Sequence, residues 1–179
     1  HTIPPISKDS INIKPGKHNI IALDAPQGTL ELNIPYSNST KNLKAIIKRR
    51  NGSQTIHVQN FNTSEKYITG NYDVEILSLP RYRESITIKQ STNTTLSIPK
   101  PGLASIISTS QGYGSIYVEK GNRLEWVCNL DDKKTQQSYY LQPGYYRVVF
   151  RPKNSKQSIY TIDKKFEIFS GSSNSIKLY

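Results

Sequence analysis

The chain has 179 residues, of which 35% are hydrophobic, and it carries 12 Tyr, one Cys, no Met and a formal net charge of +11. A single Cys excludes an internal disulfide and a cysteine-rich zinc site, and three His leave little material for metal or acid–base chemistry. No apolar run approaches the ~18 residues that a membrane-spanning helix needs.

The N-terminal segment, residues 1–22, is interpreted as the end strand of a preceding domain or as the linker from it. Its stretch Ser10–Gly16 resembles the later stretch Leu96–Gly102, which closes a strand-rich region. This similarity predicts further protein upstream of His1.

Alternating apolar and polar residues dominate the rest of the chain, as half-buried strands require. The best short-range signal is Asn51-Gly52, which predicts a two-residue hairpin between residues 45–50 and 55–58. Further alternating runs follow at residues 29–34, 72–76, 85–89 and 165–168, separated by turn clusters rich in Gly, Pro, Ser and Asn. No amphipathic helix is expected, and the pattern predicts an all-β sandwich or barrel.

The sequence also repeats itself, which predicts two copies of one small unit. Gly70–Val74 matches Gly144–Val148 at an offset of 74, and two further pairs of strands match at an offset of 80. Lys14-Pro15-Gly16 matches Lys100-Pro101-Gly102 at an offset of 86, and at the same offset Gly28, Leu30 and Leu32 match Gly114, Ile116 and Val118. We therefore expect two tandem small antiparallel β-sandwich domains, Ig-like or prealbumin-like, over residues 23–98 and 99–179.

Catalytic chemistry finds little support in the sequence, because no nucleophile-elbow, zinc-protease or phosphate-loop frame occurs. His57 alternates with Ile56 and Val58 and is expected to face solvent. Trp126 is expected in the core rather than on a ligand-stacking platform, and Cys128 is expected to be a buried, inert thiol. The prediction is a chain that is not an enzyme and has no metal or cofactor. An internal Lys–Asn isopeptide bond stays open, since it needs both side chains buried beside a carboxylate.

Basic residues gather in the first half of the chain and form a candidate surface for an anionic ligand or a partner. Five basic residues lie around the Asn51-Gly52 hairpin, and two more flank a tyrosine elsewhere in the same half: Lys41, Lys44, Lys48, Arg49 and Arg50, then Arg81, Tyr82 and Arg83. Arg and Tyr together can contact phosphate or stack on a sugar or base. The alternative is a solvated basic strand that discourages edge-to-edge pairing. No motif for specific nucleic-acid binding accompanies the cluster.

Two motifs of the second half point to a family. Gln142–Val148, with its Pro-Gly-x-Tyr-x-Val pattern, and the closing strand Ser173–Leu178 resemble the carboxypeptidase-regulatory-like (CnaB-type, transthyretin-like) β-sandwich. The first unit departs from this pattern, because Thr69-Gly70 stands where Pro-Gly is usual.

Three further stretches, Ile11–Ala22, Leu77–Arg81 and Gly112–Val118, resemble the C-terminal region of Gram-negative bacterial proteins that begin with a von Willebrand factor A domain. The resemblance implies a non-catalytic interaction or spacer module that is periplasmic, cell-surface or secreted. Its partners would be the upstream domain and a protein or acidic glycan of the cell envelope. The alternative function is a glycan- or anionic-polymer-binding module that uses the basic hairpin and exposed tyrosines.

Overall fold

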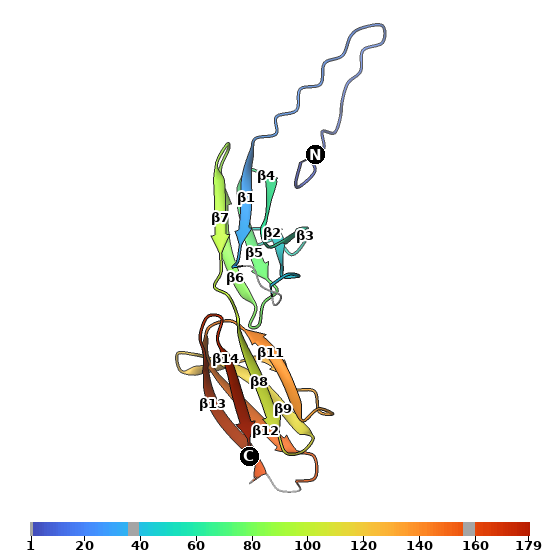
Figure 1. Ribbon diagram of the computed structural model, residues 1–179. Coiled ribbons are helices and arrows are strands. Elements are labelled where there is room, and N and C mark those ends of the chain that lie inside the picture. The colour runs from blue at the N-terminus through green and yellow to red at the C-terminus, as the bar shows by residue number, and fades with distance from the viewer. Residues whose placement is uncertain (1, 36–39, 156–159) are drawn as a thin grey trace. The chain divides into compact units, whose positions relative to one another are not determined.

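The computed structural model describes residues 2–35, 40–155 and 160–179, which contain fourteen β-strands and no α-helix (Figure 1). The all-β prediction is therefore confirmed. Contacts divide the chain into two compact units. The first comprises residues up to Asn33, Lys44–Glu75 and Arg83–Ser97, and the second comprises Ile34–Leu43, Ile76–Tyr82 and Ile98–Tyr179. The boundaries expected at 22/23 and 98/99 remain predictions.

The first unit is a sandwich of a three-stranded and a four-stranded sheet. The smaller sheet has the order β4-β1-β7, with β1 at Gln27–Asn33, β4 at Thr63–Ile68 and β7 at Asn93–Ser97. The larger has the order β3-β2-β5-β6, with β2 at Lys44–Arg49, β3 at Thr55–Asn60, β5 at Gly70–Ile76 and β6 at Tyr82–Ile88. Alternation turns Leu30, Leu32, Ile47, Tyr72 and Val74 inward, where they are almost fully buried.

The second unit repeats this plan strand for strand, β8 to β14 standing for β1 to β7. Its sheets have the orders β11-β8-β14 and β10-β9-β12-β13. The strands are β8 (Gly102–Ser108), β9 (Gly112–Lys120), β10 (Arg123–Asn129), β11 (Gln136–Leu141), β12 (Gly144–Pro152), β13 (Ile162–Ile168) and β14 (Ser173–Leu178). In each unit the last strand pairs parallel with the first, β7 with β1 and β14 with β8.

The repeat is thus confirmed, but one part of its predicted register is wrong. Gly28 corresponds to Gly102, because a Cβ on either glycine would press against equivalent isoleucines, Ile88 at 2.8 Å and Ile168 at 2.7 Å. The offset of 86 instead paired Gly28 with Gly114, which lies in β9, the counterpart of β2. Strands β1 and β9 share the same glycine–apolar alternation, and a period of two cannot tell one strand from another.

The Gly-x-Tyr-x-Val motif has one structural role in both units. Tyr72 is buried at the start of β5, and its hydroxyl donates a hydrogen bond to the carbonyl of Ile68 at 2.6 Å. Tyr146 does the same in β12, donating to the carbonyl of Gln142 at 2.6 Å. The glycine two residues before each tyrosine has a positive φ that favours glycine over other residues. The motif therefore fixes the chain as it enters the central strand of the larger sheet.

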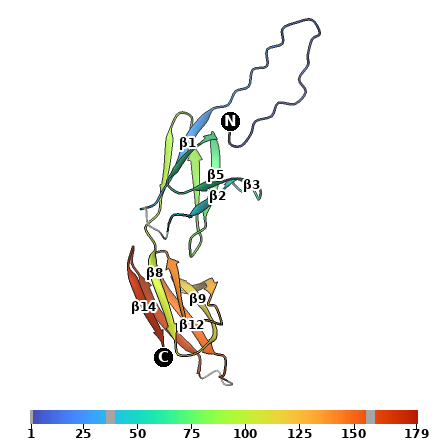
Figure 2. The same ribbon diagram turned by 45° about the vertical axis from the view of Figure 1, so that its right-hand side comes forward.

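The N-terminal segment forms no strand over residues 4–26, so the expected end strand is absent from the described residues (Figures 1 and 2). Ile3 alone makes a parallel bridge to Tyr67, and its carbonyl accepts a hydrogen bond from the Ile68 amide at 2.8 Å. Farther along, Ile11 and Ile13 are exposed. The linker interpretation and the upstream protein stay predictions.

Candidate functional site

A hairpin around Asn51-Gly52 joins β2 to β3, as predicted, and it positions the basic residues of the candidate site. Its loop is longer than the predicted two residues, because β2 ends at Arg49 and β3 begins at Thr55. Asn51 adopts a left-handed φ of 59°, and the Gly52 amide donates to the Arg49 carbonyl at 2.8 Å. The Asn51 amide donates to Asp73 Oδ2 at 3.0 Å, which ties the turn to the neighbouring strand β5. The tip of the hairpin is therefore held over the outer face of the larger sheet.

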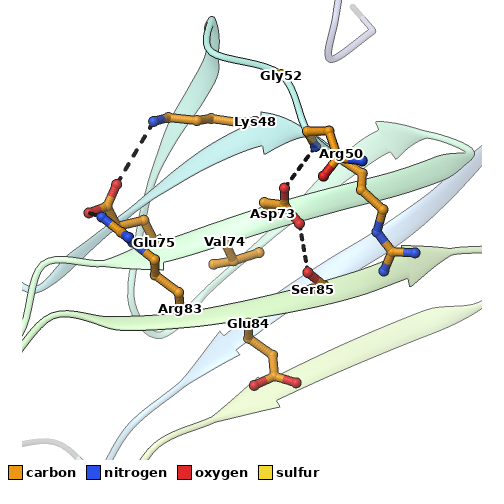
Figure 3. Close-up of a pocket in the computed structure, with 10 residues that line it drawn as sticks. Lys48, Arg50, Gly52, Asp73, Val74, Glu75, Arg83, Glu84 and Ser85 are labelled. Atoms are coloured by element: carbon orange, nitrogen blue, oxygen red, sulfur yellow. Dashed lines mark hydrogen bonds and ion pairs between the residues drawn. The ribbon is translucent and has the colours of Figure 1, made fainter.

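A surface hollow of about 620 Å³ lies on this outer face, over β2, β5 and β6 (Figure 3). Because Tyr72 and Val74 of β5 point into the core, Asp73 and Glu75 point outward. Six charged residues line the hollow: Lys48, Arg50, Asp73, Glu75, Arg83 and Glu84. Three are cations, and Asp73 and Glu75 place two carboxylates among them, whereas the Glu84 side chain points to the opposite face of β6 from Arg83 and Ser85 (Figure 3). The hollow therefore presents both signs of charge.

Glu75 is the centre of one ion network in the hollow. Its carboxylate accepts a hydrogen bond from Arg83 Nη2 at 3.1 Å, and Lys48 Nζ lies 3.9 Å away (Figure 3). Glu75 is only 9% exposed, and the two cations offset the cost of removing its negative charge from water. The Arg83 side chain is 76% exposed and keeps most of its surface available to a ligand.

Asp73 forms the second polar group of the hollow. The Ser85 hydroxyl donates to its Oδ1 at 2.7 Å, and the Asn51 amide donates to its other oxygen. These hydrogen bonds, together with the positive charge of Arg50, hold the pKa of Asp73 below its ordinary value. The carboxylate is therefore ionised at neutral pH and fixed in direction.

The structure brings together only part of the predicted surface. Lys48, Arg50 and Arg83 surround the hollow, whereas the Arg49 guanidinium lies over the ring of Tyr72, 4.8 Å from its centroid. Lys44 is exposed at the start of β2. The remaining three lie in segments grouped with the second unit: Lys41, Arg81 and Tyr82. That these eight residues bind an anionic ligand or a partner stays a prediction.

The sequence interpretation missed the acidic half of the site. Asp73, Glu75 and Ser85 were treated only as the polar positions of two alternating strands. The sequence does carry an indication of these residues: two acidic residues on the outward face of one strand favour cationic residues on the neighbouring strands. Lys48 and Arg83 supply those cations.

The prediction that His57 faces solvent is wrong. Its ring packs edge-on against Tyr67, with centroids 6.1 Å apart, whereas Val58 is 43% exposed. The inward face of β3 carries the buried Gln59, whose amide accepts from the Tyr67 hydroxyl at 3.0 Å and donates to the Leu30 carbonyl at 3.0 Å. Because the polar Gln59 faces the core and the apolar Val58 faces solvent, the alternation of β3 predicts the wrong face for His57.

The core placement of Trp126 is also wrong. The side chain is 60% exposed, and its indole N–H donates to Asn129 Oδ1 at 2.9 Å. A bulge between Trp126 and Cys128 shifts the register of β10 and turns Trp126 outward. Cys128 is partly buried against the core, and burial raises the pKa of its thiol to about 11. The thiol is therefore protonated and unreactive at neutral pH, in line with the expectation.

Two other features of the described residues bear on chemistry. No cluster of three or more His, Cys, Asp or Glu side chains there could hold a metal ion, and no helix there is long and apolar enough to span a bilayer. The buried polar side chains of the same residues include neither Lys nor Asn, so the described cores do not hold the pair that an internal isopeptide bond requires.

No protein-family model and no curated protein matches the chain. Among solved structures, it is similar to the Bacillus anthracis TIE protein (16% identity, TM-score 0.35), covering 86% of this chain but only 33% of that one. It is also similar to GBS52, the minor pilin of Streptococcus agalactiae (9% identity, TM-score 0.39, 84% and 94% covered), and to a DUF3823 family protein from Bacteroides ovatus (12%, 0.29, 81% and 96%). The chain thus spans a third of the length of the B. anthracis protein, and these likenesses concern the fold alone.

Proposed function

We propose that the chain is a non-catalytic interaction module of a bacterial cell-envelope or secreted protein. We further propose that a partner binds in the hollow over β2, β5 and β6. The observation that carries this proposal is the ion network centred on Glu75, which holds Lys48 and Arg83 in place on a sheet. Fixed side chains on a rigid sheet lose little conformational entropy when a ligand contacts them.

The charge pattern favours a polar protein segment of mixed charge as the partner. The Glu75 carboxylate already pairs with both Lys48 and Arg83, and Arg50 lies beside Asp73. A polyanion gains most where unpaired cations release its counterions, and it would meet the carboxylates of Asp73 and Glu75 here. A segment that offers both signs of charge complements the hollow better.

The experiment is photo-crosslinking of the full chain from two exposed positions. A photoreactive residue at Ser85, inside the hollow, is compared with one at Thr95, on the smaller sheet of the same unit. We expect a discrete protein adduct from Ser85 in bacteria that carry the gene, lost with Arg83→Glu and absent from Thr95. Equal adducts from both positions, or no protein adduct from Ser85, would refute the proposed site.

The absence of catalysis is part of the same proposal. It is supported by the packing of His57 against Tyr67 and by the raised pKa of the Cys128 thiol, which leave neither group poised as base or nucleophile. Turnover of any substrate in a panel of esters, peptides and glycosides would contradict it.

The finer proposal places the chain downstream of a von Willebrand factor A domain. It is supported by the sequence motifs at Ile11–Ala22, Leu77–Arg81 and Gly112–Val118. The gene product upstream of His1 tests it: a metal-binding A domain is expected, and a different neighbour would rule this placement out.

A further inference from the structure

The outer face of the larger sheet in the second unit carries aromatic side chains that the core does not use. Trp126 of β10 and Tyr145 of β12 are each 60% exposed. Tyr117 of β9 lies directly opposite Trp126 and is itself paired with Arg147 of β12. Paired residues of neighbouring strands share a face, so all four side chains point to the same side of the sheet.

The two exposed rings are spaced along this face rather than stacked together. In the order β10-β9-β12, Trp126 and Tyr145 are separated by two strand spacings of ~4.8 Å and a step of two residues, which places their Cα atoms about 12 Å apart. The Asn129 amide oxygen accepts from the indole N–H of Trp126 and from the Ser115 hydroxyl, both at 2.9 Å. The indole is therefore held in one orientation.

A group of charged side chains on β9, β12 and β13 lies beside Tyr145 on the same face. Arg147 pairs with Glu119 at 3.2 Å and with Asp163 at 3.1 Å, and Lys165 approaches Glu119 at 3.5 Å. Two cations therefore meet the carboxylates of Glu119 and Asp163, and Glu167, opposite Tyr145 on β13, adds a third carboxylate. This part of the face carries no excess of positive charge.

The fold itself does not require this arrangement. At the offset of 74 that relates β5 to β12, Asn71 stands in the first unit where Tyr145 stands in the second, and Asp73 stands where Arg147 stands. The same position of the same sheet is thus polar in one unit and aromatic in the other. The aromatic face is a property of the second unit.

We propose that this face, the Trp126–Tyr145 platform, binds a neutral oligosaccharide, with one sugar ring on the indole of Trp126 and another beside Tyr145. The proposal is independent of the hollow in the first unit. Sugar rings present C–H faces to aromatic side chains and hydroxyls to polar groups, which matches two exposed rings with ordered, hydrogen-bonding side chains beside them.

Charge complementarity separates this ligand from the other candidates. A polyanion would find no net positive charge, because Glu119 and Asp163 already balance Arg147 and Lys165. A dry apolar protein surface would have to desolvate the same ion pairs at a cost that their mutual attraction does not repay. Sugar hydroxyls can take the place of water, so the charged side chains keep their hydrogen bonds when the ligand binds.

The test uses Trp126 as its own reporter, because it is the only Trp in the chain. The full chain is titrated with neutral hexasaccharides of glucose, N-acetylglucosamine, xylose and mannose, and its fluorescence is followed at low and high salt. Calorimetry on Trp126→Ala, Trp126→Phe and Tyr145→Ala measures affinity where the reporter is lost. The matched control is Tyr140→Ala, which removes a 48% exposed tyrosine from β11 in the other sheet.

We expect saturable, salt-insensitive binding of at least one hexasaccharide, with a change in Trp126 emission. Affinity should fall about tenfold in Trp126→Ala and in Tyr145→Ala, and stay unchanged in Tyr140→Ala. Trp126→Phe should keep most of the binding, and wild-type circular dichroism should show that every variant folds. No binding across the panel, binding unchanged in both platform variants, or binding that weakens as the salt concentration rises would overturn the proposal.

Discussion

Removal of the Tyr146 hydroxyl tests the role that the repeated Gly-x-Tyr-x-Val motif has in this fold. The Tyr146 side chain is 1% exposed, and its hydroxyl donates to the Gln142 carbonyl at 2.6 Å. Tyr146→Phe keeps the packed ring and deletes only that hydrogen bond. A hydrogen bond contributes about 1 kcal/mol net, and an acceptor left unpaired in a partly buried position adds to the loss. We expect about 1.5 kcal/mol of lost stability.

In a unit of this size, 1 kcal/mol corresponds to about 4–8 °C in Tm, so the variant should melt about 6–12 °C lower. Trp126 fluorescence reports on the second unit and follows its unfolding in urea and on heating. Tyr145→Phe is the matched control: its ring is 60% exposed on the same strand, so a change within about 0.5 kcal/mol is expected.

Tyr72→Phe should cost the first unit about as much, measured by circular dichroism, because its hydrogen bond to Ile68 is equivalent. Equal stability of Tyr146→Phe and Tyr145→Phe would refute the reasoning, since the corner hydrogen bond would then contribute nothing.

Three further outcomes follow from the structure. Gly102→Ala should destabilise the second unit by about 2–3 kcal/mol in thermal unfolding, because its Cβ would lie 2.7 Å from the Phe169 carbonyl; wild-type stability would contradict the shared close approach at Gly28 and Gly102. Iodoacetamide should label Cys128 about a hundredfold more slowly at pH 8 than a thiol of pKa 9.0, since the raised pKa leaves little thiolate; labelling at the rate of a free thiol would contradict its burial. Burial raises that pKa from 9.0 to about 11, so the free energy of unfolding should fall as the pH rises from 9 to 11, because the unfolded chain loses the thiol proton first. Urea unfolding of Cys128→Ala over the same pH range should lack this decline.

The fold class and the hairpin were predictable because they depend on local signals. Alternation places Leu30 and Leu32 inward as expected, and the chain reverses direction at Asn51-Gly52 as expected, although in a loop longer than two residues. The repeat was visible for the same reason, since Tyr72 and Tyr146 make the same hydrogen bond in the same surroundings. Each of these predictions depends only on a few consecutive residues.

The errors arose where strands depart from strict alternation. A bulge beside Trp126 turned an expected core residue outward, and a one-residue slip reverses every face of a strand. In the first unit, a second bulge between Ile47 and Lys48 and the buried amide of Gln59 reversed the expected orientation of His57. Sequence alternation does not reveal a bulge or a polar residue satisfied within a core.

The candidate site was only partly predictable, because its ion pairs join strands far apart in the sequence. The basic hairpin was recognised from composition, but Lys48 meets Glu75 and Arg83 only through the order β2-β5-β6. Strand order is a tertiary property, and a single sequence does not specify it. The Trp126–Tyr145 platform needs strand order as well, because its two rings share one face only through the order β10-β9-β12.

Nuclear magnetic resonance of the parallel closing strands tests the central claim most directly, namely that one seven-stranded plan is built twice. Cross-strand amide contacts should join Leu32 to Leu96 in the first unit and Ile106 to Ile176 in the second. Contacts at both places, with parallel register, are the predicted result. An antiparallel register, or contacts in one unit without the other, would contradict the shared plan.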